Sequence, residues 1–186
     1  MPKAHTVRII SGQWRGRRLP VLDRETLRPT KDIIRETVFN WLEPILPGSR
    51  CLDAFAGTGA LGFEAASRGA AEVVLLETDR RVQQQLQQQL ALFAAKQMRL
   101  ELMAAERYLQ QAANAKFDIV FLDPPFAANM LASVCDLLAC GKWLGTVGRV
   151  YLEAAKQEGL PELPNNWELV RRKTSGDVVY GLAVVK

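Results

Sequence analysis

Short apolar runs alternate with amphipathic segments along most of the chain, and this alternation sets narrow limits on the fold. Runs such as EVVLLE (72–77) and FDIVFL (117–122) are almost wholly apolar, which is typical of strands buried on both faces. Strands that alternate with helices at this spacing predict βαβ units and a parallel sheet covered by helices. We expect strands at 50–57, 72–77, 98–103, 117–122 and 149–154, and helices at 59–70, 80–96, 106–115 and 128–140.

Both ends of the chain depart from this alternation. Residues 167–185 contain two strand-like stretches around a Ser-Gly-Asp turn, a pattern that predicts an antiparallel hairpin. Near the N-terminus, TVRII and GRRLPV flank SGQW and predict a small hairpin. The segment TKDIIRETVFNWLEPI then predicts an amphipathic helix with Thr30 as its N-cap. We therefore expect an N-terminal extension over residues 1–46 and a main domain over residues 47–186.

Positive charge is concentrated in the extension. Residues 1–35 hold nine of the 24 Lys and Arg residues but three of the 20 Asp and Glu residues, so the rest of the chain is slightly acidic. A basic arm ahead of a near-neutral body favours an anionic partner, most commonly nucleic acid. The alternative is a solvated segment that only keeps the protein in solution.

The composition argues against several classes of protein. No apolar run approaches the roughly 20 residues that a membrane span needs, and the N-terminus lacks the apolar core of a secretory signal. The three cysteines lack the spacing of metal ligands, and the single histidine, His5, argues against Ser-His-Asp catalysis and histidine metal sites. We expect a cytoplasmic monomer that binds no metal.

The stretch LDAFAGTGALGFEAASRG carries the spacing G-x-G-x-x-G at Gly57, Gly59 and Gly62, between an expected strand and an expected helix. Glu77 follows 20 residues after Gly57, at the end of the next strand. This arrangement satisfies the fingerprint of a dinucleotide-binding site, including the acid that binds ribose hydroxyls. A tight turn without a ligand is the simpler alternative.

Asp53 discriminates between the possible ligands of this loop. It lies at the end of the first strand, where its charge would repel the pyrophosphate of a dinucleotide. S-adenosylmethionine has no phosphate and carries an ammonium and a sulfonium group, so a carboxylate attracts it. Glu77 would bind the ribose of either ligand, because both contain that sugar. We therefore favour S-adenosylmethionine as the cofactor over a nicotinamide dinucleotide.

The strand at 117–122 ends on Asp123, Pro124, Pro125 and Phe126. Two prolines fix two φ angles and remove two N–H donors, which leaves the Asp123 carboxylate and the Pro124 carbonyl as rigid acceptors. Two acceptors beside an aromatic ring suit a nucleobase with an exocyclic amine, which stacks on Phe126. Asp123 would accept the proton that the amine releases. The alternative is a rigid loop start in which Asp123 caps a helix.

These motifs carry a family resemblance. DAFAGTGALG, LLETD and DPPF, in this order, resemble the class I adenosylmethionine-dependent methyltransferases that modify exocyclic amines. With RIISGQWRGRRLP, LRPTKDIIRETVFNWL and LPNNWELVRRKTSGDVVYGL, the chain is similar over its whole length to the bacterial D-type family of 16S ribosomal RNA guanine-N2 methyltransferases.

The resemblance implies a Rossmann-like α/β fold, with a seven-stranded, mostly parallel sheet whose last strand is reversed. The substrate it implies is the N2 amine of one guanine in small-subunit ribosomal RNA, within a small-subunit particle. The residues it implies for the cofactor are Asp53, Phe55, Gly57, Gly59, Glu77, Thr78, Ala105 and Asp123. Those for the base are Asp123, Pro124, Pro125 and Phe126. Those for RNA are Arg8, Trp14, Arg15, Arg17, Arg18, Arg28, Thr30 and Arg35.

One position departs from the family pattern. Members often carry a polar Asp or Asn after the third strand of the main domain, where it contacts the adenine amine, but this chain has Ala104 and Ala105. A backbone amide near Ala105, or the side chain of Glu106, would take over that contact.

Three other functions stay open on the sequence alone. A DNA adenine-N6 methyltransferase shares the DPPF motif, but the chain lacks an obvious target-recognition domain and its basic arm is short. A nucleotide-linked dehydrogenase would bind NADH without needing Asp53. A non-catalytic RNA-binding protein would tolerate the loss of Asp123.

Overall fold

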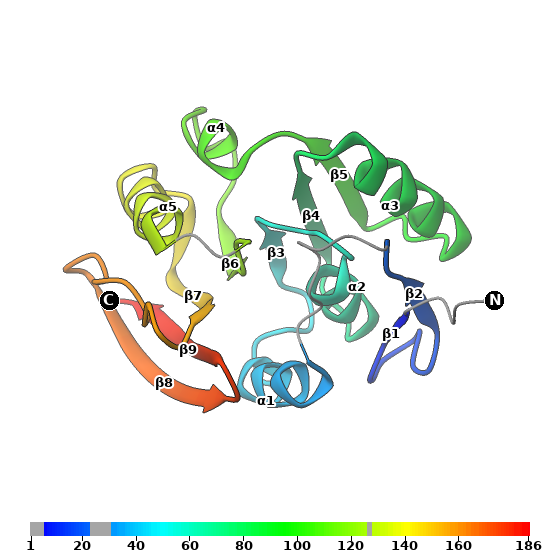
Figure 1. Ribbon diagram of the computed structural model, residues 1–186. Coiled ribbons are helices and arrows are strands. Elements are labelled where there is room, and N and C mark those ends of the chain that lie inside the picture. Colours follow the sequence, from blue (N-terminus) through cyan, green and yellow to red (C-terminus); the bar gives the residue numbers. More distant parts are fainter. Residues whose placement is uncertain (1–5, 23–30, 126–127) are drawn as a thin grey trace.

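The structure is a computed structural model that describes residues 6–22, 31–125 and 128–186, with side chains left out at 128 and 129. Seven strands form one sheet in the order β5-β4-β3-β6-β7-β9-β8, and β1 and β2 form a small antiparallel pair beside it (Figure 1). The strands of the large sheet are β3 (Arg50–Asp53), β4 (Glu72–Glu77), β5 (Met98–Leu102), β6 (Phe117–Leu122), β7 (Leu144–Ala155), β8 (Trp167–Ser175) and β9 (Val178–Val185). The small pair consists of β1 (Thr6–Arg8) and β2 (Arg18–Pro20).

The strands from β5 to β7 run parallel, and β9 pairs antiparallel with both β7 and β8. The sheet is therefore mostly parallel with a reversed last strand, as predicted. The helices are α1 (Asp32–Leu42), α2 (Ala60–Ser67), α3 (Arg80–Leu92), α4 (Ala105–Leu109) and α5 (Ala128–Cys140). Among the helices over the described residues, none combines the length and apolar composition needed to span a membrane.

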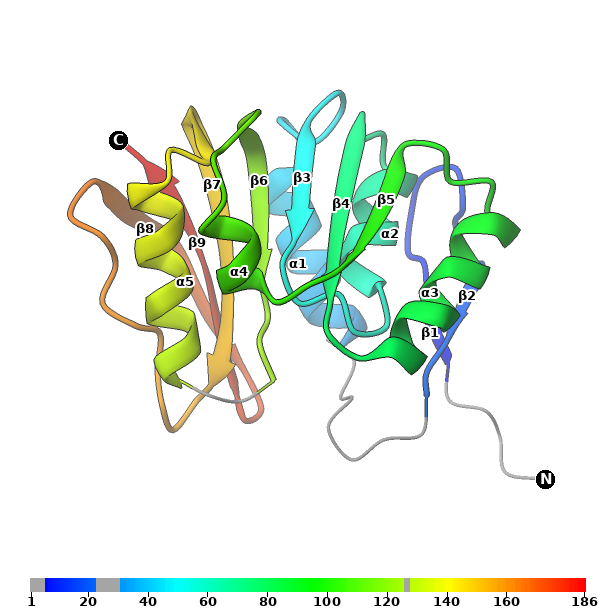
Figure 2. The same ribbon diagram turned by 90° about the horizontal axis from the view of Figure 1, so that it is seen from above.

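Both faces of the sheet are covered, which explains the continuous apolar runs of its central strands. In β4, Val73 and Leu75 pack with the hairpin, α1, α2 and α3, whereas Val74 and Leu76 pack with α4 and α5. Successive residues of a strand point to opposite faces of the sheet, so both sets of side chains must be apolar when both faces are covered. Figure 2 shows the two helix layers on either side of the sheet.

Several boundaries differ from the predicted ones for local reasons. Helix α3 ends at Leu92 and not near residue 96, because Ala94 adopts a left-handed conformation with a φ of 49°. Strand β7 begins at Leu144, earlier than the predicted residue 149, and a register shift in β6 between Phe117 and Ile119 accommodates its extra residues. Helix α1 begins at Asp32, and its predicted cap, Thr30, lies outside the described residues.

The N-terminal hairpin is tied to α2 by a buried carboxylate. Glu64 is inaccessible to solvent and accepts hydrogen bonds from the backbone N–H groups of Ile10 (2.7 Å) and Ser11 (3.0 Å). Its carboxylate also lies 2.6 Å from Nε of Arg68 and 3.6 Å from the guanidinium of Arg35. These donors offset the cost of burying the charge, so the hairpin is anchored through its backbone.

Removal of the Glu64 carboxylate is expected to destabilise the whole fold. Glu64→Ala removes the Glu64 carboxylate that lies beside the buried Arg35 guanidinium, and it leaves the N–H groups of Ile10 and Ser11 without their acceptor. We expect a loss of about 3–5 kcal/mol of unfolding free energy. Chemical denaturation measures the loss. Glu162→Ala, at an exposed loop position, is the matched control and is expected to change stability by less than about 0.5 kcal/mol. Equal stability of the two variants would contradict the anchoring role.

Candidate functional site

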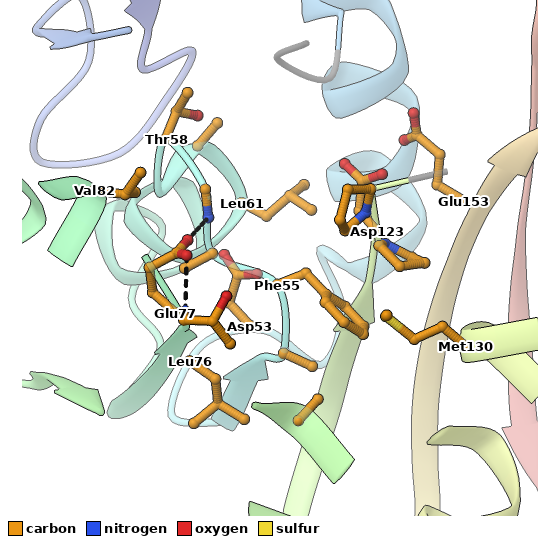
Figure 3. Close-up of a pocket in the computed structure, with 18 of the residues that line it drawn as sticks. Asp53, Phe55, Thr58, Leu61, Leu76, Glu77, Val82, Asp123, Met130 and Glu153 are labelled. Atoms are coloured by element: carbon orange, nitrogen blue, oxygen red, sulfur yellow. Dashed lines mark hydrogen bonds between the residues drawn. The ribbon is translucent and has the colours of Figure 1, made fainter. Parts of the chain in front are cut away.

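A cavity of about 410 Å³ lies beside the carboxyl ends of β3, β4, β6 and β7 (Figure 3). Residues 53–58 after β3, 76–79 after β4, 103–106 after β5 and 123–125 after β6 line it, together with Glu153 of β7. Lys31, Ile34 and Val178 line it from the side of α1 and β9. Because β3 has β4 on one side and β6 on the other, this is the point of an open α/β sheet where ligands bind.

Asp53 ends β3 and is almost completely buried. Its carboxylate accepts a hydrogen bond of 2.9 Å from the backbone N–H of Gly62, in the first turn of α2. Burial raises the pKa of Asp53 to about 7, with smaller contributions from the nearby negative charges of Asp123 and Glu77. A cationic ligand in the cavity would favour the charged form of this carboxyl.

Gly62 allows this close packing of α2 against β3. A Cβ atom at this position would lie 2.3 Å from Cδ2 of Leu75 and 3.2 Å from Oδ2 of Asp53. Gly59, which precedes α2, adopts a left-handed conformation with a φ of 78° that other residues rarely adopt. Two glycines of the motif are therefore required by the turn and by the packing of the helix behind Asp53.

Glu77 ends β4 and fixes the glycine loop from the opposite side. Its Oε2 accepts a hydrogen bond from the N–H of Gly57 (3.0 Å), and its Oε1 accepts from those of Thr78 and Asp79 (2.8 Å each; Figure 3). Asp79 in turn caps α3 by accepting from the N–H groups of Arg81 and Val82. The carboxylate predicted to hold a ribose thus also orders the loop around it.

Asp123 and Pro124 follow β6 on the far side of β3 from Glu77. Figure 3 shows Asp53 and Glu77 on one side of the cavity and Asp123 on the other, with Phe55 and Met130 near Asp123. Pro125 also lines the cavity, whereas Phe126 lies outside the described residues. The structure thus brings together Asp53 and Asp123, which the sequence predicted at the ends of neighbouring strands.

The segment after β5 also reaches the cavity. Ala104, Ala105 and Glu106 line it, and Ala105 is the first residue of α4.

In the described part of the chain, no group of three His, Cys, Asp or Glu side chains is arranged to hold a metal ion.

Sequence analysis missed Glu153 and Tyr151, both of β7. Glu153 is 8% exposed and lines the cavity, and the buried hydroxyl of Tyr151 donates a hydrogen bond to its Oε2. A signal for Glu153 was present, because YLEA, like LLE at 75–77, is an apolar strand that reaches an acid near its carboxyl end.

Two residues assigned to RNA contact are interior, which corrects those assignments. The Arg35 side chain is inaccessible to solvent and donates to the Arg8 carbonyl (2.8 Å) and the Asp32 carboxylate (2.6 Å). Trp14 is 7% exposed and packs against Phe63 and Phe93. Their positions in the core leave neither side chain accessible to a macromolecular ligand.

The remaining arginines of the arm are accessible to different degrees. Arg8, Arg15 and Arg18 are exposed, whereas Arg17 is partly buried over the ring of Phe93, 3.6 Å from its centroid. Arg17 also donates to the carbonyl of Leu92, at the end of α3 opposite the cavity. Helix α3 has 13 residues, so the end that Arg17 contacts lies about 20 Å from the end beside the cavity. The other two predicted RNA contacts, Arg28 and Thr30, lie outside the described residues.

Comparison with known proteins finds relatives along almost the whole chain. Residues 7–184 match the family described as "Conserved hypothetical protein 95". A protein of Escherichia coli K12 named ribosomal RNA small subunit methyltransferase D is 48% identical over 176 residues, covering 95% of this chain and 88% of the relative. The protein of the same name from Haemophilus influenzae is 46% identical over 179 residues, covering 95% of this chain and 92% of the relative.

The fold is shared with a solved structure. The structure of yhhF from Escherichia coli matches with a TM-score of 0.91 and 44% sequence identity, covering 98% of this chain and 99% of that one. The Rossmann-like class I fold expected from the resemblance is therefore confirmed. The chain belongs to the family described as conserved hypothetical protein 95, and it is similar to proteins named ribosomal RNA small subunit methyltransferase D.

Proposed function

We propose that the protein transfers a methyl group from S-adenosylmethionine to the exocyclic N2 amine of one guanine in small-subunit ribosomal RNA. The observation that carries this proposal is a cavity with a carboxylate pair, Asp53 and Glu77, on one side and the Asp123-Pro124 acceptors on the other. The names of the relatives from Escherichia coli and Haemophilus influenzae support ribosomal RNA as the substrate. With ribosomal RNA as the substrate, we expect the protein to act in the cytoplasm.

The residues on the Asp53 side fit S-adenosylmethionine. The carboxylates of Asp53 and Glu77 line this side of the cavity, so its charge favours a cationic ligand and disfavours the pyrophosphate of a dinucleotide. Asp53 would meet the positive end of the cofactor, Glu77 the ribose, and the chain around Ala105 the adenine. When bound, the cofactor supplies an electrophilic methyl group on a sulfonium.

The residues on the Asp123 side position the base. The Asp123 carboxylate and the Pro124 carbonyl accept the two N–H bonds of the amine, which turns the nitrogen lone pair toward the cofactor side of the cavity. Pro124 and Pro125 restrict the backbone, so these acceptors need little reorganisation during the reaction. Acceptors aimed at an amine that gains positive charge stabilise the transition state, and Asp123 then accepts the released proton.

Mass spectrometry of ribosomal RNA tests the function directly. We expect a strain without this protein to lack one N2-methylguanine in its small-subunit RNA, and the wild-type chain to restore it. Purified protein should methylate small subunits from that strain, but not DNA. Transfer to adenine N6 of DNA would overturn the assignment in favour of a DNA methyltransferase.

We further propose that the exposed arginines of the arm contact RNA phosphates. Arg15→Ala with Arg18→Ala is expected to weaken RNA binding and to reduce the slope of log K against log salt by up to about 2, because two phosphate contacts are lost. Arg17 is retained because it packs on Phe93. Titrations at several salt concentrations measure the slope.

A control for this pair removes the same charge elsewhere. Arg107, in α4, and Lys116, between α4 and β6, are both exposed. Helix α4 packs on the opposite face of the sheet from the hairpin. Alanine at both positions is expected to leave the salt slope near that of the wild type. If both double variants bind RNA equally well, the arm has no part in the interface.

A further inference from the structure

Glu153 belongs to the cavity but has no part in the transfer as proposed so far. It lies on β7, two residues after Tyr151, and both side chains point to the face of the sheet covered by α1. Lys31, Ile34 of α1 and Val178 of β9 also line the cavity. An apolar side chain would fill this site at a lower desolvation cost, so a buried carboxylate here indicates a functional requirement.

Tyr151 fixes the direction of this carboxylate. Its hydroxyl donates to Oε2 of Glu153, and its ring packs between those of Phe121 and Tyr180. Burial, together with the charges of Glu153 and Asp123, raises the pKa of Tyr151 well above its ordinary value, so the hydroxyl keeps its proton. A carboxylate offers about four acceptor sites, so it can hold the tyrosine and a ligand donor together.

The acceptors of Asp123 and Pro124 alone do not select a base, because guanine N2 and adenine N6 are both exocyclic amines. The neighbouring ring atom differs between the two bases. In guanine the N1 next to the amine carries a hydrogen and donates, whereas in adenine the corresponding N1 has a lone pair and accepts. A second carboxylate beside the first therefore attracts the edge of guanine and repels that of adenine.

We propose that Glu153 accepts a hydrogen bond from N1–H of the target guanine and so selects guanine over bases without that hydrogen. Tyr151 is the positioning residue that orients Glu153 through its hydroxyl. The inference rests on the proposed function and adds the residue that sets its base specificity. A site built to accept from one N–H group rejects an analogue without it, because the buried acceptor is then left facing a lone pair.

The test replaces the target guanine by 2-aminopurine, which keeps the 2-amine but has an acceptor at N1. Small subunits are reconstituted with RNA that carries either base at the methylated position. Wild-type protein is expected to favour guanine by at least about 100-fold in kcat/KM. In Glu153→Gln, the side-chain amide can donate to the N1 of 2-aminopurine. We therefore expect kcat/KM on guanine to fall about 100-fold, and the ratio of kcat/KM on guanine to that on 2-aminopurine to be near or below one.

Tyr151→Phe separates orientation from charge. This variant keeps the Glu153 carboxylate and is expected to lose about 10-fold in kcat/KM on guanine, while its preference for guanine decreases without reversing. Binding of S-adenosylmethionine, measured by calorimetry, should match the wild type in both variants, which also verifies that each is folded.

The outcomes separate this inference from the proposed function. If the wild-type protein methylates 2-aminopurine as readily as guanine, Glu153 does not read N1 and the inference is wrong, whatever the variants do. Equal losses on both bases in Glu153→Gln would show a structural role only. If the wild-type protein methylates no guanine in the reconstituted particles, the proposed function itself fails.

Discussion

Asp123→Ala is expected to lower kcat/KM for methyl transfer by at least about 1,000-fold, because it removes both an acceptor for the amine and the group that takes its proton. Cofactor binding should survive, since Asp53 and Glu77 lie on the other side of the cavity. Binding near pH 7 should even strengthen slightly. The charge of Asp123 raises the pKa of Asp53, so its removal leaves more of Asp53 ionised.

Calorimetry with S-adenosylmethionine and single-turnover methylation measure these two effects separately. Asp123→Asn keeps the shape of the side chain and an acceptor but loses the charge, and it should retain more activity than the alanine variant. Asp136→Asn, at an exposed position on α5, is the matched control and should behave as the wild type. Loss of cofactor binding in Asp123→Ala would show that the two sides of the cavity do not divide the work as proposed.

Asp53→Asn is expected to abolish cofactor binding while it stabilises the free protein above pH 7. The folded-state pKa of about 7 lies above the ordinary value of 3.8, so the folded state binds this proton more tightly than the unfolded state. Stability from Asp53 is therefore fully present below about pH 4 and is lost as pH rises through about 7. The difference between these two pKa values corresponds to at most about 4 kcal/mol of unfolding free energy.

Thermal melts at pH 5 and pH 8 follow this linkage. Asparagine cannot ionise but can still accept from the N–H of Gly62, so its advantage over aspartate should grow from the lower to the higher pH. The affinity of the wild type for S-adenosylmethionine should rise as pH increases through 7, and that of the variant should stay weak at both values. A variant less stable than the wild type at pH 8 would contradict the buried-charge account.

The sheet and three carboxylates at its strand ends could be predicted because they depend on local patterns. Strand ends are visible as the last apolar residue of a run, and parallel strands bring their carboxyl ends to one edge of the sheet. Asp53, Glu77 and Asp123 follow from that rule, and the structure places all three around one cavity. Glu153 obeys it less clearly, since β7 continues to Ala155 after the acid.

The basic arm was harder to interpret because charge alone does not reveal burial. Arg35 looks like a surface cation on an amphipathic helix, but its interior position depends on Glu64, which is 29 positions later in the chain, and on the carbonyl of Arg8. Trp14 depends on aromatic partners in α2 and just after α3. Contacts of this range have no local pattern in the sequence.

The anchoring of the hairpin has a consequence for how the chain is made. The N–H groups of Ile10 and Trp14 donate hydrogen bonds to Glu64 and Ser67, which lie 54 and 53 positions downstream. At about 5–20 residues per second, the ribosome completes these partners roughly 3–10 s after the arm itself. During that interval the N–H groups of Ile10 and Trp14 lack these acceptors from their own chain. The arm therefore leaves the ribosome as a basic segment whose hydrogen bonds to α2 can form only later in synthesis.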